Sequence, residues 1–103
     1  MITMCIRYTL DPSKLEDFER YARNLPGPIQ RCGGELLGYF LPTKFAGPTN
    51  IALALISFRS LAAYEDYRAA LLNDAGAVAS AADADKSKCI LAEDRSFLQR
   101  IPE

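Results

Sequence analysis

A glycine pair followed by an apolar stretch, Gly33 to Pro42, constrains the fold of this chain more than any other segment. An apolar stripe with helical spacing runs up to Cys32, and glycine ends helices because it adopts the left-handed cap conformation at no steric cost. From residue 35 the side chains follow a strand-like pattern, which ends at Pro42 because proline lacks a backbone donor. The stretch therefore predicts a helix that stops and a strand that leaves it, as in a βαβ unit.

Four segments have the pattern of β-strands. They are residues 2–9, 35–42, 51–58 and 89–98. The third segment is almost entirely apolar, which is typical of a central strand covered on both faces. In the second, we expect Leu37 and Tyr39 on one face, and Gly38 inside the strand predicts a bulge or the close approach of another backbone.

Three helices are expected between these strands. Asp11 is a good N-cap and Pro12 suits the first helical position, so the first helix starts there and continues to about residue 32. Pro26 and Pro28 predict a kink near residues 24–28, because each proline removes a donor and crowds the preceding turn. Ser60 caps a second helix at 61–72. The alanine-rich residues 74–86 predict a short, loosely packed third helix.

This order of elements predicts an α+β fold: ferredoxin-like βαββαβ, with an antiparallel four-stranded sheet and helices on one face. At 103 residues the chain is expected to form one domain. Its strands carry too many apolar residues for the second face of the sheet to lie in water. Pairing of two sheets would cover that face, so we expect a homodimer.

Composition excludes several functions. Twelve basic and thirteen acidic residues give a formal net charge of −1, which offers no cationic surface to nucleic acid or to an anionic membrane. The chain has no histidine, which excludes Ser-His-Asp and Cys-His catalysis and histidine-ligated zinc or haem. Its three cysteines are odd in number and form no C-x-x-C pair, so neither a disulfide framework nor a zinc site is supported. No metal and no cofactor is expected. With no secretory signal and no long apolar run, a cytoplasmic location is expected.

The segment Arg31 to Pro42, the segment Ser60 to Arg68 and the last strand with Glu93, Arg95 and Phe97 resemble the NIPSNAP family, most closely its small bacterial members. The resemblance covers nearly the whole chain. It implies a dimeric α/β barrel, in which two ferredoxin-like subunits close a barrel between their sheets. Relatives by fold include cofactor-free antibiotic-biosynthesis monooxygenases and haem-degrading monooxygenases. Unlike the family pattern, the alanine-rich run lacks the tryptophan or phenylalanine that usually fills this region.

Five side chains are candidates for ligand binding. Arg7, Glu93 and Arg95 lie on the first and last strands, which are neighbours in the strand order 4-1-3-2, so they could meet on the barrel face. Since a buried arginine needs a carboxylate or an anionic ligand, these residues predict an anion- or carbonyl-binding pocket. A cross-strand ion-pair ladder is the more common alternative. Tyr39 and Tyr64 could donate hydrogen bonds to a ligand, or be core residues with hydroxyls at the rim.

Two functions stay open on the sequence alone. The first is a homodimer whose barrel cavity binds a small apolar or aromatic molecule, with oxygenase- or isomerase-type activity that needs no cofactor. The second is a non-catalytic interaction or structural module, which would expose an apolar patch beyond the dimer interface. Tyr67 and Arg68 are not expected to share a pocket, because adjacent helical residues point in different directions.

Overall fold

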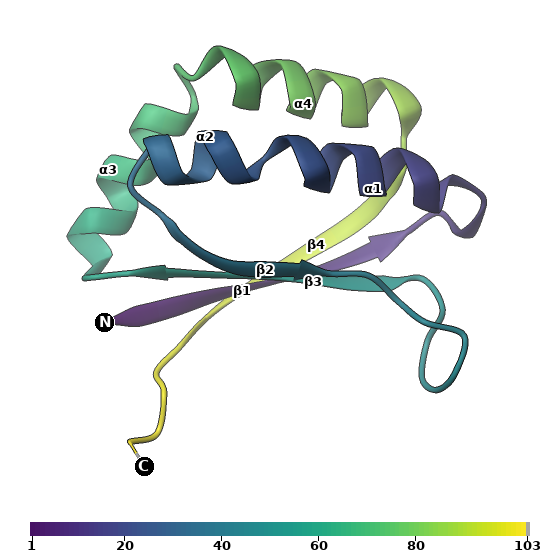
Figure 1. Ribbon diagram of the computed structural model, residues 1–103, viewed down its shortest axis with the longest axis horizontal. Helices are drawn as coiled ribbons and strands as arrows, with labels where there is room; N and C mark the ends of the chain where they lie inside the picture. Colours follow the sequence, from purple (N-terminus) through teal and green to yellow (C-terminus); the bar gives the residue numbers. More distant parts are fainter. Residues whose placement is uncertain (103) are drawn as a thin grey trace.

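A computed structural model describes residues 1–102 and shows a four-stranded antiparallel sheet with helices on one face (Figure 1). The elements are β1 (Ile2–Leu10), a 3₁₀ turn (Pro12–Lys14), α1 (Leu15–Asn24), α2 (Pro26–Arg31), β2 (Glu35–Phe40), β3 (Ile51–Phe58), α3 (Leu61–Leu71), α4 (Ala75–Ser87) and β4 (Ile90–Leu98). The strand order is β2-β3-β1-β4. The predicted ferredoxin-like architecture and strand order are confirmed.

The first helical segment starts, breaks and ends at the residues that its stereochemistry favours. The Asp11 side chain accepts a hydrogen bond from the Ser13 backbone N–H at 2.9 Å, which caps the 3₁₀ turn. α1 ends at Asn24 and α2 begins at Pro26, so the predicted interruption near residues 24–28 is confirmed. Gly33 then adopts a φ of +103°, the left-handed conformation that stops α2.

The second helical segment differs from the prediction in one respect. Ser60 Oγ accepts a hydrogen bond from the Ala63 backbone N–H at 3.1 Å, so it caps α3 as predicted. α4 was expected to be short, but it has 13 residues and is the longest helix in the described part of the chain. Asp74 caps it by accepting from the Ala77 N–H at 3.0 Å. The high helix propensity of alanine explains its length.

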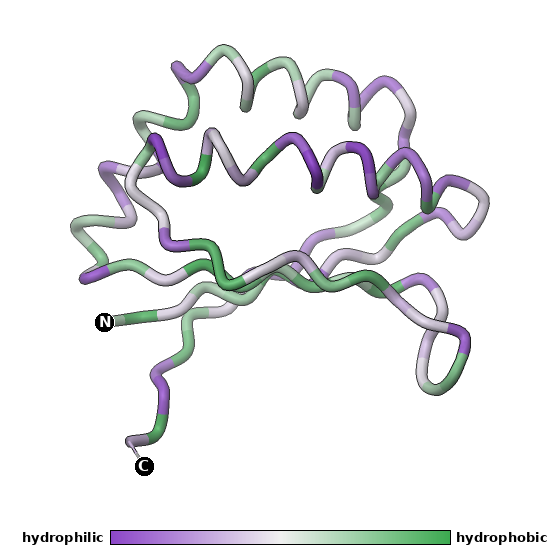
Figure 2. The backbone as a smooth tube through the Cα atoms, viewed as in Figure 1, coloured by the Kyte–Doolittle hydropathy of each residue, from purple (hydrophilic) through white to green (hydrophobic). Residues whose placement is uncertain are grey.

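The core fills the space between the helices and one face of the sheet. Four residues of β1 and four of β3 are buried there: Met4, Ile6, Tyr8 and Leu10, with Ala52, Ala54, Ile56 and Phe58. They pack against Phe18, Leu25 and Ile29 of the first helical segment. Figure 2 shows hydrophobic residues concentrated along the strands and hydrophilic residues recurring along α1 and α4.

The other face of the sheet, here called the open face, carries no helix (Figure 1). β3 is a central strand as predicted, but within this chain only one of its faces is covered. Leu53 and Leu55 on its open side remain partly exposed in the single chain, and the predicted cover of this face depends on a second subunit. Within residues 1–102, no helix combines the length and the apolar character needed to cross a membrane.

A bulge in β2 changes which residues face the helices. The pairing of β2 with β3 shifts between Leu36 and Gly38, which confirms the irregularity that the glycine predicted. Leu36 lies opposite Ile56 and Tyr39 opposite Ala54, both on the helix-covered face. The expected simple alternation, with Tyr39 and Leu37 on one face, is therefore wrong, and the bulge turns Tyr39 toward the helices.

Candidate functional site

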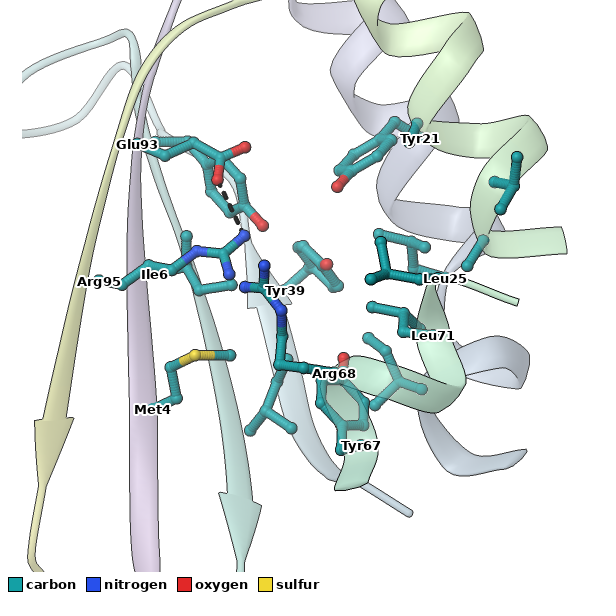
Figure 3. A pocket seen from close by; sticks show the side chains of 17 residues that line it. Met4, Ile6, Tyr21, Leu25, Tyr39, Tyr67, Arg68, Leu71, Glu93 and Arg95 are labelled. Carbon is teal, nitrogen blue, oxygen red and sulfur yellow. Dashed lines mark hydrogen bonds and ion pairs between the residues drawn. The ribbon is translucent and has the colours of Figure 1, made fainter. Parts of the chain in front are cut away.

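A cavity of about 250 Å³ lies between the helix-covered face of the sheet and the helices (Figure 3). Its walls combine side chains from all four strands and all four α-helices. They are Met4, Ile6, Tyr8, Tyr21, Leu25, Ile29, Tyr39, Ile56, Tyr67, Arg68, Leu71, Leu72, Ala77, Val78, Ala81, Glu93 and Arg95. Most of these are apolar, and the charged groups come from β4 and α3.

The cavity exists because α4 brings only small side chains to it. Ala77 and Ala81 of α4 line the cavity, and the largest residue that this helix adds to the wall is Val78. Protein interiors normally pack without voids much larger than a water molecule. The alanine-rich sequence of α4 thus leaves open a space that a larger residue at the same positions would fill.

Glu93 and Arg95 form the charged edge of the cavity on β4. They lie opposite Tyr8 and Ile6 of β1, so both point to the helix-covered face. Arg95 Nη2 donates a hydrogen bond to Glu93 Oε2 at 3.1 Å. Burial alone would lower the pKa of Arg95, but the Glu93 carboxylate and the Tyr64 hydroxyl outweigh it, so the pKa is raised and the guanidinium stays charged.

Arg68 reaches the same region from α3. In Figure 3 its guanidinium and that of Arg95 approach the same part of the cavity from opposite sides. Arg68 Nη1 donates to the Tyr64 hydroxyl at 3.3 Å, and none of the ion pairs found within residues 1–102 involves Arg68. The cavity therefore holds one guanidinium paired with a carboxylate and one that contacts only a neutral oxygen.

Four tyrosines supply the remaining polar groups of the wall. They are Tyr8, Tyr21, Tyr39 and Tyr67. Burial raises the pKa of every one of them, to about 12 for Tyr21 and Tyr67. Their hydroxyls are therefore protonated at neutral pH, where they act as hydrogen-bond donors and not as bases.

Three of the predicted site residues line this cavity: Tyr39, Glu93 and Arg95. Tyr64 lies at its edge, where its ring packs against Phe97 with the ring centres 4.8 Å apart and its hydroxyl accepts from Arg68. Tyr64 is thus close to the site without lining it.

The expectation that Arg7 meets Glu93 and Arg95 is wrong. Arg7 lies opposite Asp94, on the open face, and its Nη1 is 4.0 Å from Asp94 Oδ2. Successive side chains of a strand alternate between faces, so Arg7 points away from its neighbours Ile6 and Tyr8. Glu93 and Arg95 themselves face the helices and not the open face where a barrel would close.

Tyr67 and Arg68 line the cavity, and sequence reasoning missed both. Both line the cavity although they are adjacent in α3. The long arginine side chain reaches the cavity although it starts about 100° around the helix from the tyrosine. One sequence signal was available for Tyr67, since it lies three residues after Tyr64 and four before Leu71 in a helical apolar stripe.

Metal binding has no support in this geometry. Within residues 1–102, no three histidine, cysteine, aspartate or glutamate side chains gather closely enough to hold an ion. The cavity brings one carboxylate, two guanidiniums and protonated phenols, which suit hydrogen bonding to a polar organic group.

Comparison with known proteins identifies the family. The NIPSNAP family model matches residues 4–102. The crystal structure of protein Atu4242 from Agrobacterium tumefaciens superposes with a TM-score of 0.81 at 22% identity, covering 98% of this chain and 94% of that one. An uncharacterised NIPSNAP domain protein from Burkholderia xenovorans gives a TM-score of 0.80 at 16% identity, covering 98% and 95%.

A more distant neighbour in fold has a different description. A "putative antibiotic biosynthesis monooxygenase" from Nitrosomonas europaea superposes with a TM-score of 0.74 at 9% identity, covering 99% of this chain and 100% of that one. Among curated proteins, no sequence matches. At these identities the superpositions establish the fold alone, whereas the family model spans nearly the whole sequence. The chain therefore belongs to the NIPSNAP family, and it shares a ferredoxin-like fold with bacterial members of that family.

Proposed function

We propose that this protein is a homodimer that binds a small, largely apolar or aromatic molecule, and that its pocket supports cofactor-free chemistry of the oxygenase or isomerase type. The observation that carries the proposal is the cavity of about 250 Å³, with mainly apolar walls and a few convergent polar groups. Ligand pockets commonly measure about 300–1,000 Å³, so this one suits a small ligand. It lies between the sheet and the helices of one chain, whereas the barrel cavity expected from the sequence would lie between the sheets of two subunits.

The polar groups suit proton transfer next to a carbonyl. Glu93 is the single carboxylate among the residues that line the cavity, and it could take a proton from a carbon beside a carbonyl group. The electron pair of that C–H bond then forms a C=C bond and the π pair of the carbonyl moves onto its oxygen, so that the neutral Tyr21 and Tyr39 hydroxyls could stabilise the resulting enolate. An isomerase returns the proton to another carbon.

A cofactor-free oxygenase would use the same enolate differently, as an electron donor to molecular oxygen. The fold shared with the described monooxygenase supports testing this reaction, although similarity of fold alone does not carry function. Both reaction types need the same pocket occupied by an enolisable substrate, so binding is the first property to test.

The open face supports the homodimer. Phe40 lies opposite Leu53 on this face, and Phe40 keeps 50% of its surface exposed. In Figure 1 the loop between β2 and β3 and the C-terminal segment both extend beyond this side of the sheet. They carry Phe45 and Ile101, which are 95% and 85% exposed. A second copy packed on this face would cover these apolar surfaces.

A pair of matched alanine substitutions in α4 tests the pocket. Ala81 and Ala82 are both exposed, but only Ala81 lines the cavity. We expect indole, as a neutral aromatic probe, to bind the wild-type protein and Ala82→Leu equally in saturation-transfer NMR. We expect Ala81→Leu to lose at least about tenfold in indole affinity, because the larger side chain occupies the cavity. Equal binding by all three proteins would place indole elsewhere and contradict the proposal.

The non-catalytic interaction module remains the second candidate, and the mouth of the cavity favours it. Leu72 and Val78 line the mouth and keep 72% and 51% of their surfaces exposed. A partner protein could insert an apolar side chain between them. The interaction module would be the favoured function if no small probe binds in the wild-type cavity.

A further inference from the structure

We infer that the pocket selects a ligand with one negative charge, a carboxylate attached to a small apolar or aromatic body, and that Arg68 binds this carboxylate. The inference rests on the proposed function and names the chemical class of its ligand. It draws on three observations: the charge balance of the cavity wall, the weak present contact of Arg68, and the separation of charged from apolar lining residues.

The charge balance of the wall favours a monoanion. Two guanidiniums, of Arg68 and Arg95, and one carboxylate, of Glu93, leave one positive charge. The four lining tyrosines add no charge, because burial keeps them protonated. One carboxylate on a ligand would neutralise the site. A phosphate dianion would exceed the positive charge of the wall by one.

The contacts of the two arginines assign them different roles. Arg95 is held by Glu93 at 3.1 Å and is fixed on the strand. The present contact of Arg68 is a 3.3 Å hydrogen bond to the neutral Tyr64 hydroxyl, which is long for a bond of this kind. A ligand carboxylate could replace that contact with a paired, charge-assisted one, because the planar guanidinium matches a carboxylate with two parallel N–H donors.

The rest of the wall determines the body of the ligand. Met4 and Ile6 lie on the sheet side of the cavity, and Leu25 and Leu71 face them from the helix side (Figure 3). A carboxylate at Arg68 would therefore direct the attached ring or chain between these two apolar walls. A cavity of about 250 Å³ accommodates one or two rings with a short substituent more readily than a molecule of three or more fused rings.

Benzoate and benzamide test the inference, because they have nearly the same shape and differ by one charge at neutral pH. We expect isothermal titration of the full-length protein to show benzoate binding at least about tenfold more tightly than benzamide. Arg68→Met should bring this ratio close to one while benzamide binding changes little. Arg68→Lys keeps the charge without the planar donor pair, so it should retain part of the preference.

Arg59→Met is the matched control, because Arg59 is exposed and does not line the cavity. It removes the same charge from the protein and should leave the benzoate-to-benzamide ratio unchanged. Since the comparison of the two probes on wild-type protein needs no variant, an Arg68 variant that folds poorly does not prevent the test.

The possible failures separate the inference from the proposed function. If benzamide binds and benzoate shows no preference, or if Arg68→Met keeps the preference, the anion selectivity is wrong and the apolar pocket stands. The same holds if Arg68→Met weakens both probes equally, since Arg68 then only shapes the pocket. If neither probe binds at millimolar concentration while indole does, the inference alone is wrong. If indole fails as well, the proposed function is wrong too.

Discussion

Gly34 occupies a position where one added methyl group tests the packing of both the core and the pocket. A Cβ atom there would lie 2.9 Å from Ile29 Cγ2, 3.0 Å from Ile56 Cγ2 and 3.1 Å from Tyr67 Cε1. Carbon atoms pack best at about 3.5–4.0 Å, so each neighbour would have to move by roughly 0.5 Å. The three neighbours belong to α2, β3 and α3, so the movement of any one of these elements would not relieve all three close contacts.

We expect Gly34→Ala to lower the free energy of unfolding by about 2–3 kcal/mol, the upper part of the range for overpacked cores. For a domain of this size, that corresponds to a decrease in Tm of roughly 10–20 °C. Urea denaturation followed by circular dichroism measures the change. Because Tyr67 lines the cavity, displacement of its ring should also weaken indole binding.

Gly27→Ala is the control for this substitution. Its Cβ would meet only the end of the Arg31 side chain, 3.1 Å from Nη1, which is not one of the two nitrogens that bond Asp74. Gly27 lies inside α2, where alanine is the better helix former, so we expect stability unchanged or raised by up to about 1 kcal/mol. If Gly34→Ala unfolds within about 0.5 kcal/mol of the wild type at the same urea dependence, the close packing argued around Gly34 is refuted.

Three further predictions concern pH and assembly. The free energy of unfolding should fall as pH rises above 10.0, because tyrosines of the unfolded chain ionise there, whereas Tyr21 and Tyr67 of the folded protein keep their protons up to a pKa of about 12. Ultraviolet titration should show that these two tyrosines ionise late, and their ionisation at pH 10.0 would contradict the prediction. Asp74→Asn should lower Tm near neutral pH, and the difference from the wild type should shrink in acid. The hydrogen bonds from Arg31 hold the pKa of Asp74 below 3.8, so the ionised carboxylate stabilises the fold at neutral pH and this stabilisation is lost as the pH falls from 3.8 through the lowered pKa. An equal loss of Tm in acid would contradict this prediction. Leu55→Asp should convert a dimer into an 11.4 kDa monomer in analytical ultracentrifugation, and a monomeric wild type would contradict the homodimer.

The sequence predicted the elements of the fold because their boundaries depend on local stereochemistry. Asp11, Pro26, Gly33 and Ser60 each favour one backbone conformation whatever surrounds them, and each stands at a boundary in the structure. The length of α4 was harder to predict. Alanine propagates a helix but offers little apolar surface, so its sequence does not show how far packing extends the helix.

The site was predicted only in part because its residues meet through the three-dimensional path of the chain. Arg7 was assigned to the site because its strand lies next to the last strand, which carries Glu93 and Arg95. Alternation with the buried Ile6 and Tyr8 nevertheless places Arg7 on the opposite face. Tyr39 faces the helices only because of the bulge before it, and a glycine predicts that a bulge occurs without giving its direction.

The cavity follows from the lack of large side chains in the alanine-rich segment, which the sequence shows. The alanine-rich residues of α4 bring no large side chain to the wall beneath them, so space remains between Ala77, Ala81 and the sheet. Sequence alone could not show that the space stays open, because neighbouring elements can move inward to fill it. Here Asp74 caps α4 and pairs with Arg31 of α2, at 3.0 Å and 3.1 Å, which ties the start of the alanine-rich helix to its neighbour in the helical layer. With its start fixed to α2, a helix of small residues leaves a pocket between itself and the sheet.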